Sequence, residues 1–145
     1  MPATTGEEIA LGGITIRFLL EGEQTNGAVS VFEFDVDAGS PTPPPHSHDG
    51  YEETVYGLRG GLTWTVDGER HELAEGDVLC IPRGAVHRFE NEGDVTAATL
   101  AVVTPGILGP DYFRELSAVL AAAAGGPPDF AELAAIMRRH GLTPA

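Results

Sequence analysis

The chain of 145 residues contains no lysine and a single cysteine, Cys80. One cysteine excludes an internal disulfide framework, so apolar packing alone must hold a domain of this length together. The sequence also lacks an apolar run long enough to cross a bilayer, and no charged stretch followed by an apolar run suggests export. We therefore expect one domain in a reducing cytoplasm.

Positive charge is scarce along the whole chain. Eight arginines are the basic residues and stand against 22 acidic ones, which gives a formal net charge of -14 at pH 7. A protein this acidic is repelled by phosphate backbones and by anionic lipid surfaces. We therefore expect neither nucleic acid nor a membrane as a partner.

Helical periodicity is missing between Ile14 and Val103. Short β-branched and aromatic runs alternate there with glycine, proline and Asx-Gly pairs, the pattern of an all-β barrel or sandwich. Asn26-Gly27 and Asp67-Gly68 suit the positive φ angles of tight hairpins. The expected strands cover residues 14–20, 28–36, 53–58, 62–66, 70–73, 78–81, 87–90 and 96–103.

The pattern becomes helical near the C-terminus. Apolar residues recur at helical spacing in residues 113–120 and again in 130–137, and a Gly-Gly-Pro-Pro turn at 125–128 separates the two segments. We therefore divide the chain into a barrel of residues 1–106 and an extension of residues 107–145, a pair of α-helices packed on the barrel. The alternative, a separate subdomain, would be too short to support its own core.

Two histidines one residue apart, His46 and His48, follow the stiff segment PTPPP. Side chains two apart on a strand share a face, so both imidazoles can reach one point; the alternative is a pair of exposed loop histidines. Two glutamates come next. An unbroken strand would put Glu52 on the histidine face, but the turn pair Asp49-Gly50 resets that parity, so parity alone does not choose between Glu52 and Glu53.

A second stretch, GDVLCIPRGAVHRFEN at residues 76–91, supplies a third histidine. Pro82 and Gly84 predict a sharp corner, and His87 begins the strand that follows it. A barrel could aim this side chain inward. His87 is therefore the natural third nitrogen ligand.

The two stretches together resemble the paired motifs of the cupin superfamily. The first family motif has glycine, a short spacer, His-x-His, three or four residues, glutamate, six residues and glycine. The second has glycine, five residues, Pro-x-Gly, two residues, histidine, three residues and asparagine. The matching residues here are Gly39, His46, His48, Glu53 and Gly60, then Gly76, Pro82, Gly84, His87 and Asn91. The fifteen residues between the motifs equal the spacing of single-domain bacterial cupins, whereas the six residues between Gly39 and His46 exceed the usual five.

The resemblance spans roughly residues 30–104 and implies a conical β-barrel of the jelly-roll type. It further implies that one divalent transition metal (Fe, Mn, Ni, Co, Cu or Zn) is bound by His46, His48, Glu53 and His87. Glu53 is preferred over Glu52 because it keeps six residues to the motif glycine and would face the barrel interior. A homodimer is also implied, since family members commonly pair through their N-terminal strands.

The segment VVTPGILGPDYFREL at residues 102–116 resembles the tail of bacterial cupins labelled quercetin-dioxygenase-like. That likeness implies a metal-dependent enzyme acting on a small organic substrate, a quercetinase-like dioxygenase of phenolic or enolic compounds. Glu53 would then also act as the general base. The alternatives are a metal-dependent isomerase or lyase, and a non-catalytic cupin that binds a small molecule.

Most other notable side chains have a structural interpretation. Phe89 lies two residues after His87 on the same strand and therefore on the same face, so it is the side chain best placed to line a pocket. Cys80, flanked by Leu79 and Ile81, is expected to be a buried and inert thiol. The remaining aromatic residues of the strands are expected mainly in the core: Phe32, Phe34, Tyr51, Tyr56 and Trp64. Three arginines near the motif ends could bind an anionic group but are expected at the solvated surface: Arg59, Arg83 and Arg88.

Overall fold

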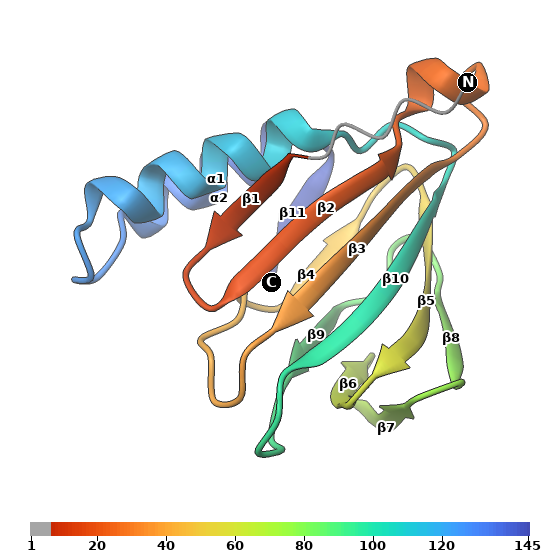
Figure 1. Cartoon of the computed structure of the whole chain (residues 1–145). Helices are drawn as coiled ribbons and strands as arrows, with labels where there is room; N and C mark the ends of the chain where they lie inside the picture. Colours follow the sequence, from red (N-terminus) through yellow and green to blue (C-terminus); the bar gives the residue numbers. More distant parts are fainter. Residues whose placement is uncertain (1–6) are drawn as a thin grey trace.

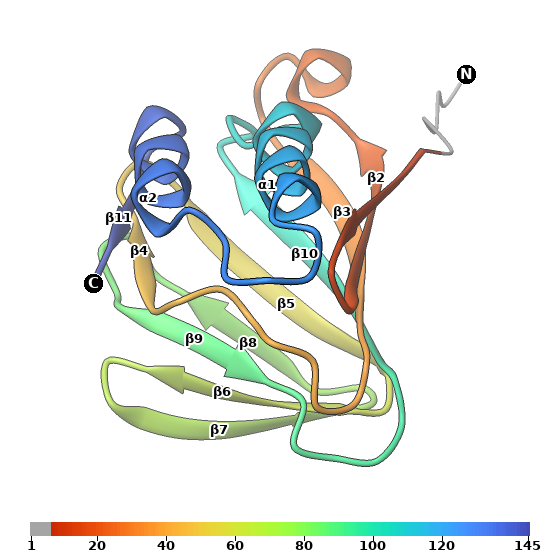
Figure 2. The same ribbon diagram turned by 90° about the vertical axis from the view of Figure 1, so that its left-hand side faces the viewer.

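Alternating buried and exposed positions build two antiparallel sheets that face each other (Figures 1 and 2). The computed structural model describes residues 7–145. The larger sheet has the strand order β1 (Glu8–Leu11), β2 (Ile14–Leu20), β3 (Ser30–Val36), β10 (Ala97–Thr104), β5 (Glu52–Arg59) and β8 (Val78–Ile81). The smaller sheet has the order β11 (Leu142–Pro144), β4 (His46–His48), β9 (His87–Glu90), β6 (Gly61–Val66) and β7 (Glu69–Ala74).

The expected all-β fold is confirmed, and each of the eight predicted strands is present with its ends shifted by at most two residues. Three short strands, β1, β4 and β11, lie outside the predicted ranges, as does a short 3-10 helix at Gly22–Thr25. The two facing antiparallel sheets form the jelly-roll arrangement that the motif resemblance implies, and the two C-terminal helices are added to it.

The core lies between the sheets and is rich in aromatic rings. Along β3 every second side chain is buried, including Phe32 and Phe34. Phe32 stacks on Phe18 of β2 with 5.0 Å between ring centroids, and Phe34 meets Trp64 of the opposite sheet edge-on at 6.4 Å. Full burial of a side chain of this size contributes about 1.5–3 kcal/mol, so these contacts join the two sheets into one unit.

Two helices lie side by side across one open end of the barrel, α1 (Pro110–Ala122) and α2 (Phe130–Arg139) (Figure 2). The α2 helix begins at Asp129, whose side chain accepts a hydrogen bond from the Glu132 N–H at 3.1 Å. The Ser117 hydroxyl of α1 donates to the Ala10 carbonyl of β1 at 2.7 Å. Neither helix of the described chain has the length and apolarity that crossing a membrane requires.

The last residues of the chain form an edge strand beside the histidine pair. In β11, Leu142 pairs with His48, and Pro144 pairs with His46. The Ala145 N–H also donates to the Pro45 carbonyl at 2.9 Å. The C-terminus therefore covers the free edge of β4, which would otherwise pair with β9 at one residue alone.

The prediction that Cys80 is buried is wrong. Cys80 is exposed, whereas Ile81 beside it is fully buried. Side chains of β8 alternate between the two faces of the sheet, and the face of Ile81 packs on the core whereas the face of Cys80 meets solvent. Cys80 pairs with Thr54 on the solvent face, and an apolar neighbour on each side in the sequence does not reveal which face a residue occupies.

Candidate metal centre

Three histidines meet where β4 and β9 pair. His46 and His48 come from β4, and His87 begins β9 opposite His46. Each ring offers a nitrogen that lies within 4.8 Å of a nitrogen on each of the other two rings. All three side chains are buried, with exposed fractions of 8%, 3% and 2%. This is the arrangement of a buried metal-binding triad.

Two residues of the second motif, Gly84 and Asn91, fix the backbone around the triad. Gly84 has a φ of 86°, a value that other residues rarely adopt, and its N–H donates to the His48 carbonyl at 2.8 Å. The Asn91 amide group at the end of β9 donates to the carbonyls of Val36 and Val95 at 2.8 and 2.9 Å. The corner before His87 is thereby attached to β4, and the end of β9 is attached to β3.

Hydrogen bonds orient two of the imidazole rings. His46 Nδ1 lies 2.9 Å from the Pro44 carbonyl, and His87 Nδ1 lies 2.9 Å from the Ala85 carbonyl. A carbonyl only accepts, so Nδ1 carries the proton in both rings and Nε2 keeps a free lone pair. The third ring, His48, stacks on Tyr51 at 4.5 Å, and its Nδ1 has no hydrogen-bond partner within residues 7–145.

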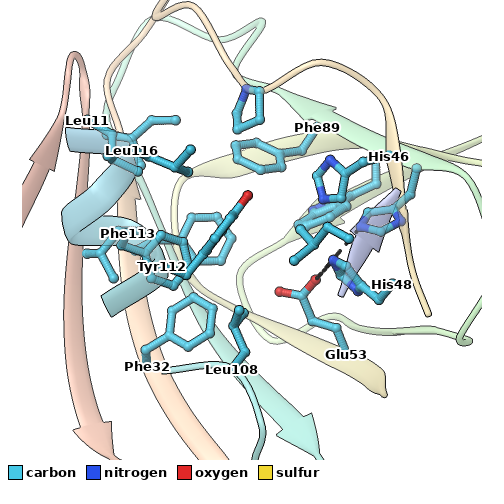
Figure 3. A pocket seen from close by; sticks show the side chains of 17 residues that line it. Leu11, Phe32, His46, His48, Glu53, Phe89, Leu108, Tyr112, Phe113 and Leu116 are labelled. Carbon is cyan, nitrogen blue, oxygen red and sulfur yellow. Dashed lines mark ion pairs between the residues drawn. The ribbon is translucent and has the colours of Figure 1, made fainter. Parts of the chain in front are cut away.

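Glu53 of β5 faces the triad (Figure 3). Its Oε1 lies 3.8 Å from His48 Nε2 and 3.9 Å from His87 Nε2. These separations are too long for hydrogen bonds. Two ligand atoms that are each about 2.1 Å from one ion lie at most about 4.2 Å apart, so the gap between these groups fits an ion. The residues present therefore suit a divalent metal.

Glu52 points away from the triad. Its exposed carboxylate pairs with the guanidinium of Arg83, with Nη2 to Oε1 at 2.8 Å. The hydrogen bonds from Arg83 lower the pKa of Glu52 to about 2. On β5 the buried face carries Glu53, Val55 and Gly57, so the new strand after the Asp49-Gly50 bend has the parity that places Glu53 inside.

Burial determines the protonation of the cluster. It lowers the pKa of His46 to about 4 and that of His48 to about 2, and it lowers the pKa of His87 as well. The histidines are therefore neutral near pH 7, the form in which imidazole binds metals. Burial raises the pKa of Glu53 to about 7, because removal from water disfavours the charged carboxylate. A divalent ion would stabilise the carboxylate form.

A cavity of about 70 Å³ opens beside the triad. Its walls include Phe32, Phe34, Trp64 and Phe89, so Phe89 lines the pocket as its parity predicted. Tyr56, by contrast, is 43% exposed on the outer face of β5. Apart from the triad and Glu53, the lining is mostly apolar.

Sequence reasoning missed the wall that the C-terminal segment contributes. Leu108, Tyr112, Phe113, Leu116 and Leu142 all line the cavity. The helical spacing of Phe113 and Leu116 indicated a packed face, but nothing in the spacing showed that this face lies opposite the histidines, and no pattern marked Leu108 or Leu142. Among the described residues no arginine lines the cavity, and the surface expectation holds for Arg83 and Arg88, which pair with Glu52 and Glu90.

Three comparisons place the chain among known proteins. A model of the cupin domain matches residues 32–103. Quercetin 2,3-dioxygenase of Bacillus subtilis is 29% identical over 111 residues, which are 77% of this chain and 32% of that protein. An uncharacterized protein of Methanocaldococcus jannaschii is 36% identical over 98 residues, covering 67% of this chain and 78% of the relative.

Among solved structures, a sugar phosphate isomerase from a cupin superfamily, from Silicibacter pomeroyi, superposes with a TM-score of 0.55 at 26% identity. The match covers 63% of this chain and 59% of that one. The chain therefore spans about a third of the dioxygenase and less than two thirds of the isomerase. The matched model, the archaeal relative and the jelly-roll fold show that this chain belongs to the cupin superfamily.

Proposed function

We propose that this protein binds one divalent transition metal through His46, His48, Glu53 and His87 and acts as a dioxygenase on a small phenolic or enolic compound. The observation that carries the proposal is the convergence of three neutral imidazoles and one buried carboxylate at the wall of an apolar cavity. Four protein ligands leave up to two positions of an octahedron open for substrate and oxygen. The named activity of the Bacillus relative supports this choice.

A redox-active metal in this position would supply the electronic coupling between a deprotonated substrate and O2. The chain itself supplies a mostly apolar cavity with aromatic walls, a lining that disfavours water beside the reacting atoms. It also supplies Glu53, whose pKa is raised to about 7 by burial in the metal-free protein. Glu53 is the group placed to take the proton of a substrate hydroxyl.

The second candidate is a metal-dependent isomerase, the activity named for the Silicibacter structure. A sugar phosphate needs a cationic side chain for its phosphate, most often arginine or lysine. This chain has no lysine, and no arginine of the described residues lines the cavity. The apolar lining therefore favours the oxygenase over an enzyme that acts on sugar phosphates.

Elemental analysis of the purified protein, followed by O2 uptake with flavonols, catechols and diketones, tests this proposal. We expect about one iron, nickel, copper, cobalt or manganese ion per chain and metal-dependent O2 uptake with at least one compound class. Tightly held zinc, with no O2 uptake after exchange for redox-active metals, would contradict the oxygenase and favour an isomerase, a lyase or a binding protein.

A further inference from the structure

Tyr112 carries the one hydroxyl among the side chains that line the cavity. It lies in α1, is 4% exposed, and points from the helix into the cavity toward the histidines (Figure 3). The other lining residues of the described C-terminal segment are apolar: Leu108, Phe113, Leu116 and Leu142. The helical wall thus places a single polar atom opposite the candidate metal centre.

The Tyr112 hydroxyl has no hydrogen-bond partner in the part of the chain that the structure describes. The hydroxyl oxygen is accessible within the cavity, because the fully buried side-chain polar atoms without a partner in the described residues are others, those of Ser30, His48, Tyr51 and Trp64. A molecule that enters the cavity can therefore accept a hydrogen bond from it. Two neighbours hold the Tyr112 ring: Phe113 packs on it edge-on with 5.0 Å between ring centroids, and the ring of His140 is tilted against it at 5.3 Å. His140 is in turn paired with Glu115 of α1.

The chemistry of this hydroxyl selects an acceptor. Burial, and to a smaller extent the charge of Glu53, raise the pKa of Tyr112, so the phenol stays protonated and can donate. The partner must therefore offer an oxygen or nitrogen lone pair. A cavity of about 70 Å³ is well below the 300–1,000 Å³ or so of sites for drug-sized ligands, so the partner that fits this cavity is compact.

We propose that Tyr112 is a substrate-binding residue, which donates a hydrogen bond to a compact oxyanion, such as an enolate, bound at the histidine cluster. The inference rests on the proposed metal-dependent function and narrows its substrate class from phenolic and enolic compounds in general to small chelating oxyanions. It also gives the C-terminal helix a direct part in the site.

Cobalt(II)-loaded protein titrated with acetohydroxamate, a small chelating oxyanion, tests the inference through the visible absorption of the metal. Tyr112→Phe removes the hydroxyl and keeps the ring, so we expect affinity for acetohydroxamate to fall about tenfold. The matched control is Tyr56→Phe, which removes a hydroxyl from the outer face of β5 and should leave the affinity unchanged. Both variants should keep native metal content and a native thermal midpoint.

Equal acetohydroxamate affinity in Tyr112→Phe and the native protein would overturn the role of Tyr112 while leaving the metal centre intact. A loss of cobalt or a lower thermal midpoint in Tyr112→Phe would also overturn it, because the hydroxyl would then act through the fold. Failure of the native protein to bind cobalt would refute the proposed metal site and this inference together.

Discussion

The two sides of the cavity differ in origin and in chemistry. One side, formed by β4, β5 and β9, carries three imidazoles and a carboxylate, and backbone hydrogen bonds orient two of its rings. The other side, formed by α1 and the C-terminal tail, carries apolar side chains and one phenol. In the proposed function, the strand side holds the metal ion and the helical side determines which ligand fits beside it. Substitutions on the two sides should therefore have separable effects.

Loss of a strand-side imidazole should have the largest effect. His87→Ala removes one of the four proposed ligands, so we expect the metal affinity to fall by more than about 100-fold. Removal of a group that only supports a ligand already lowers metal affinity about 10–100-fold. Metal content after dialysis against a weak chelator measures this. His71→Ala is the control, because His71 lies on β7 away from the cavity. Equal metal retention in both variants would argue against the site.

Removal of residues 142–145 tests how far the two sides depend on each other. The deletion takes away β11 and the fully buried Leu142, so we expect a loss of about 2–5 kcal/mol in unfolding free energy. Metal affinity should fall as well, because β4 loses its edge partner although every proposed ligand is present. Urea denaturation and metal titration measure the two effects.

The control for this deletion is Thr143→Ala, which removes only the hydrogen bonds of the Thr143 hydroxyl to Asp49. If the truncated chain had the same unfolding free energy and the same metal affinity as the full-length chain, β4 would hold its ligands without help from the C-terminus.

A lower pH should destabilise the metal-free protein, and the groups responsible are the buried histidines on the strand side of the cavity. Burial lowers the folded-state pKa of His46 to about 4, below its unfolded value of 6.5. Between those values the unfolded chain binds a proton that the folded chain does not, so stability falls as pH falls from 6.5 toward 4. From pH 6.5 to pH 5 this residue alone should account for about 1–2 kcal/mol of unfolding free energy.

Urea denaturation of the metal-free protein at the two pH values measures that slope, and His46→Gln should flatten it by the stated amount. An identical slope in the variant would show that His46 is not buried in its neutral form.

The smallest effect is expected outside both sides of the cavity. Cys80→Ser changes an exposed residue of the edge strand, so stability should change by less than about 0.5 kcal/mol and metal content should not change. In the native protein the thiol should react rapidly with Ellman's reagent. A thiol that reacts only after denaturation would restore the interpretation of Cys80 as buried.

The strand side could be predicted from the sequence to a large extent, because short-range features specify it. His46 and His48 share a face wherever a strand forms, and the corner at Pro82 and Gly84 sets where His87 begins. The inward parity of Glu53 needed the spacing between two motifs, since the Asp49-Gly50 bend resets the alternation. The ligand roles of these residues, the metal, the homodimer and the cytoplasmic location remain predictions.

The helical side could not be predicted, because its position depends on long-range packing. The spacing of Phe113 and Leu116 predicts an apolar helical face, but not the surface that the face covers. The pairing of Leu142 with His48 joins residues 94 apart in the chain, and no local pattern marks it. The division at residue 106 stays a prediction. Although the segment after it could be identified as helical, its contribution to the cavity became evident only in three dimensions.

The glutamate pair offers the most direct test of the proposed metal centre, since adjacent residues on one strand face opposite ways. Glu53→Ala and Glu52→Ala should be compared by metal content and metal affinity under identical loading. We expect Glu53→Ala to lower the metal affinity at least about 100-fold and Glu52→Ala to leave the metal affinity at its native value. Unchanged metal binding in Glu53→Ala together with its loss in Glu52→Ala would contradict the proposed site.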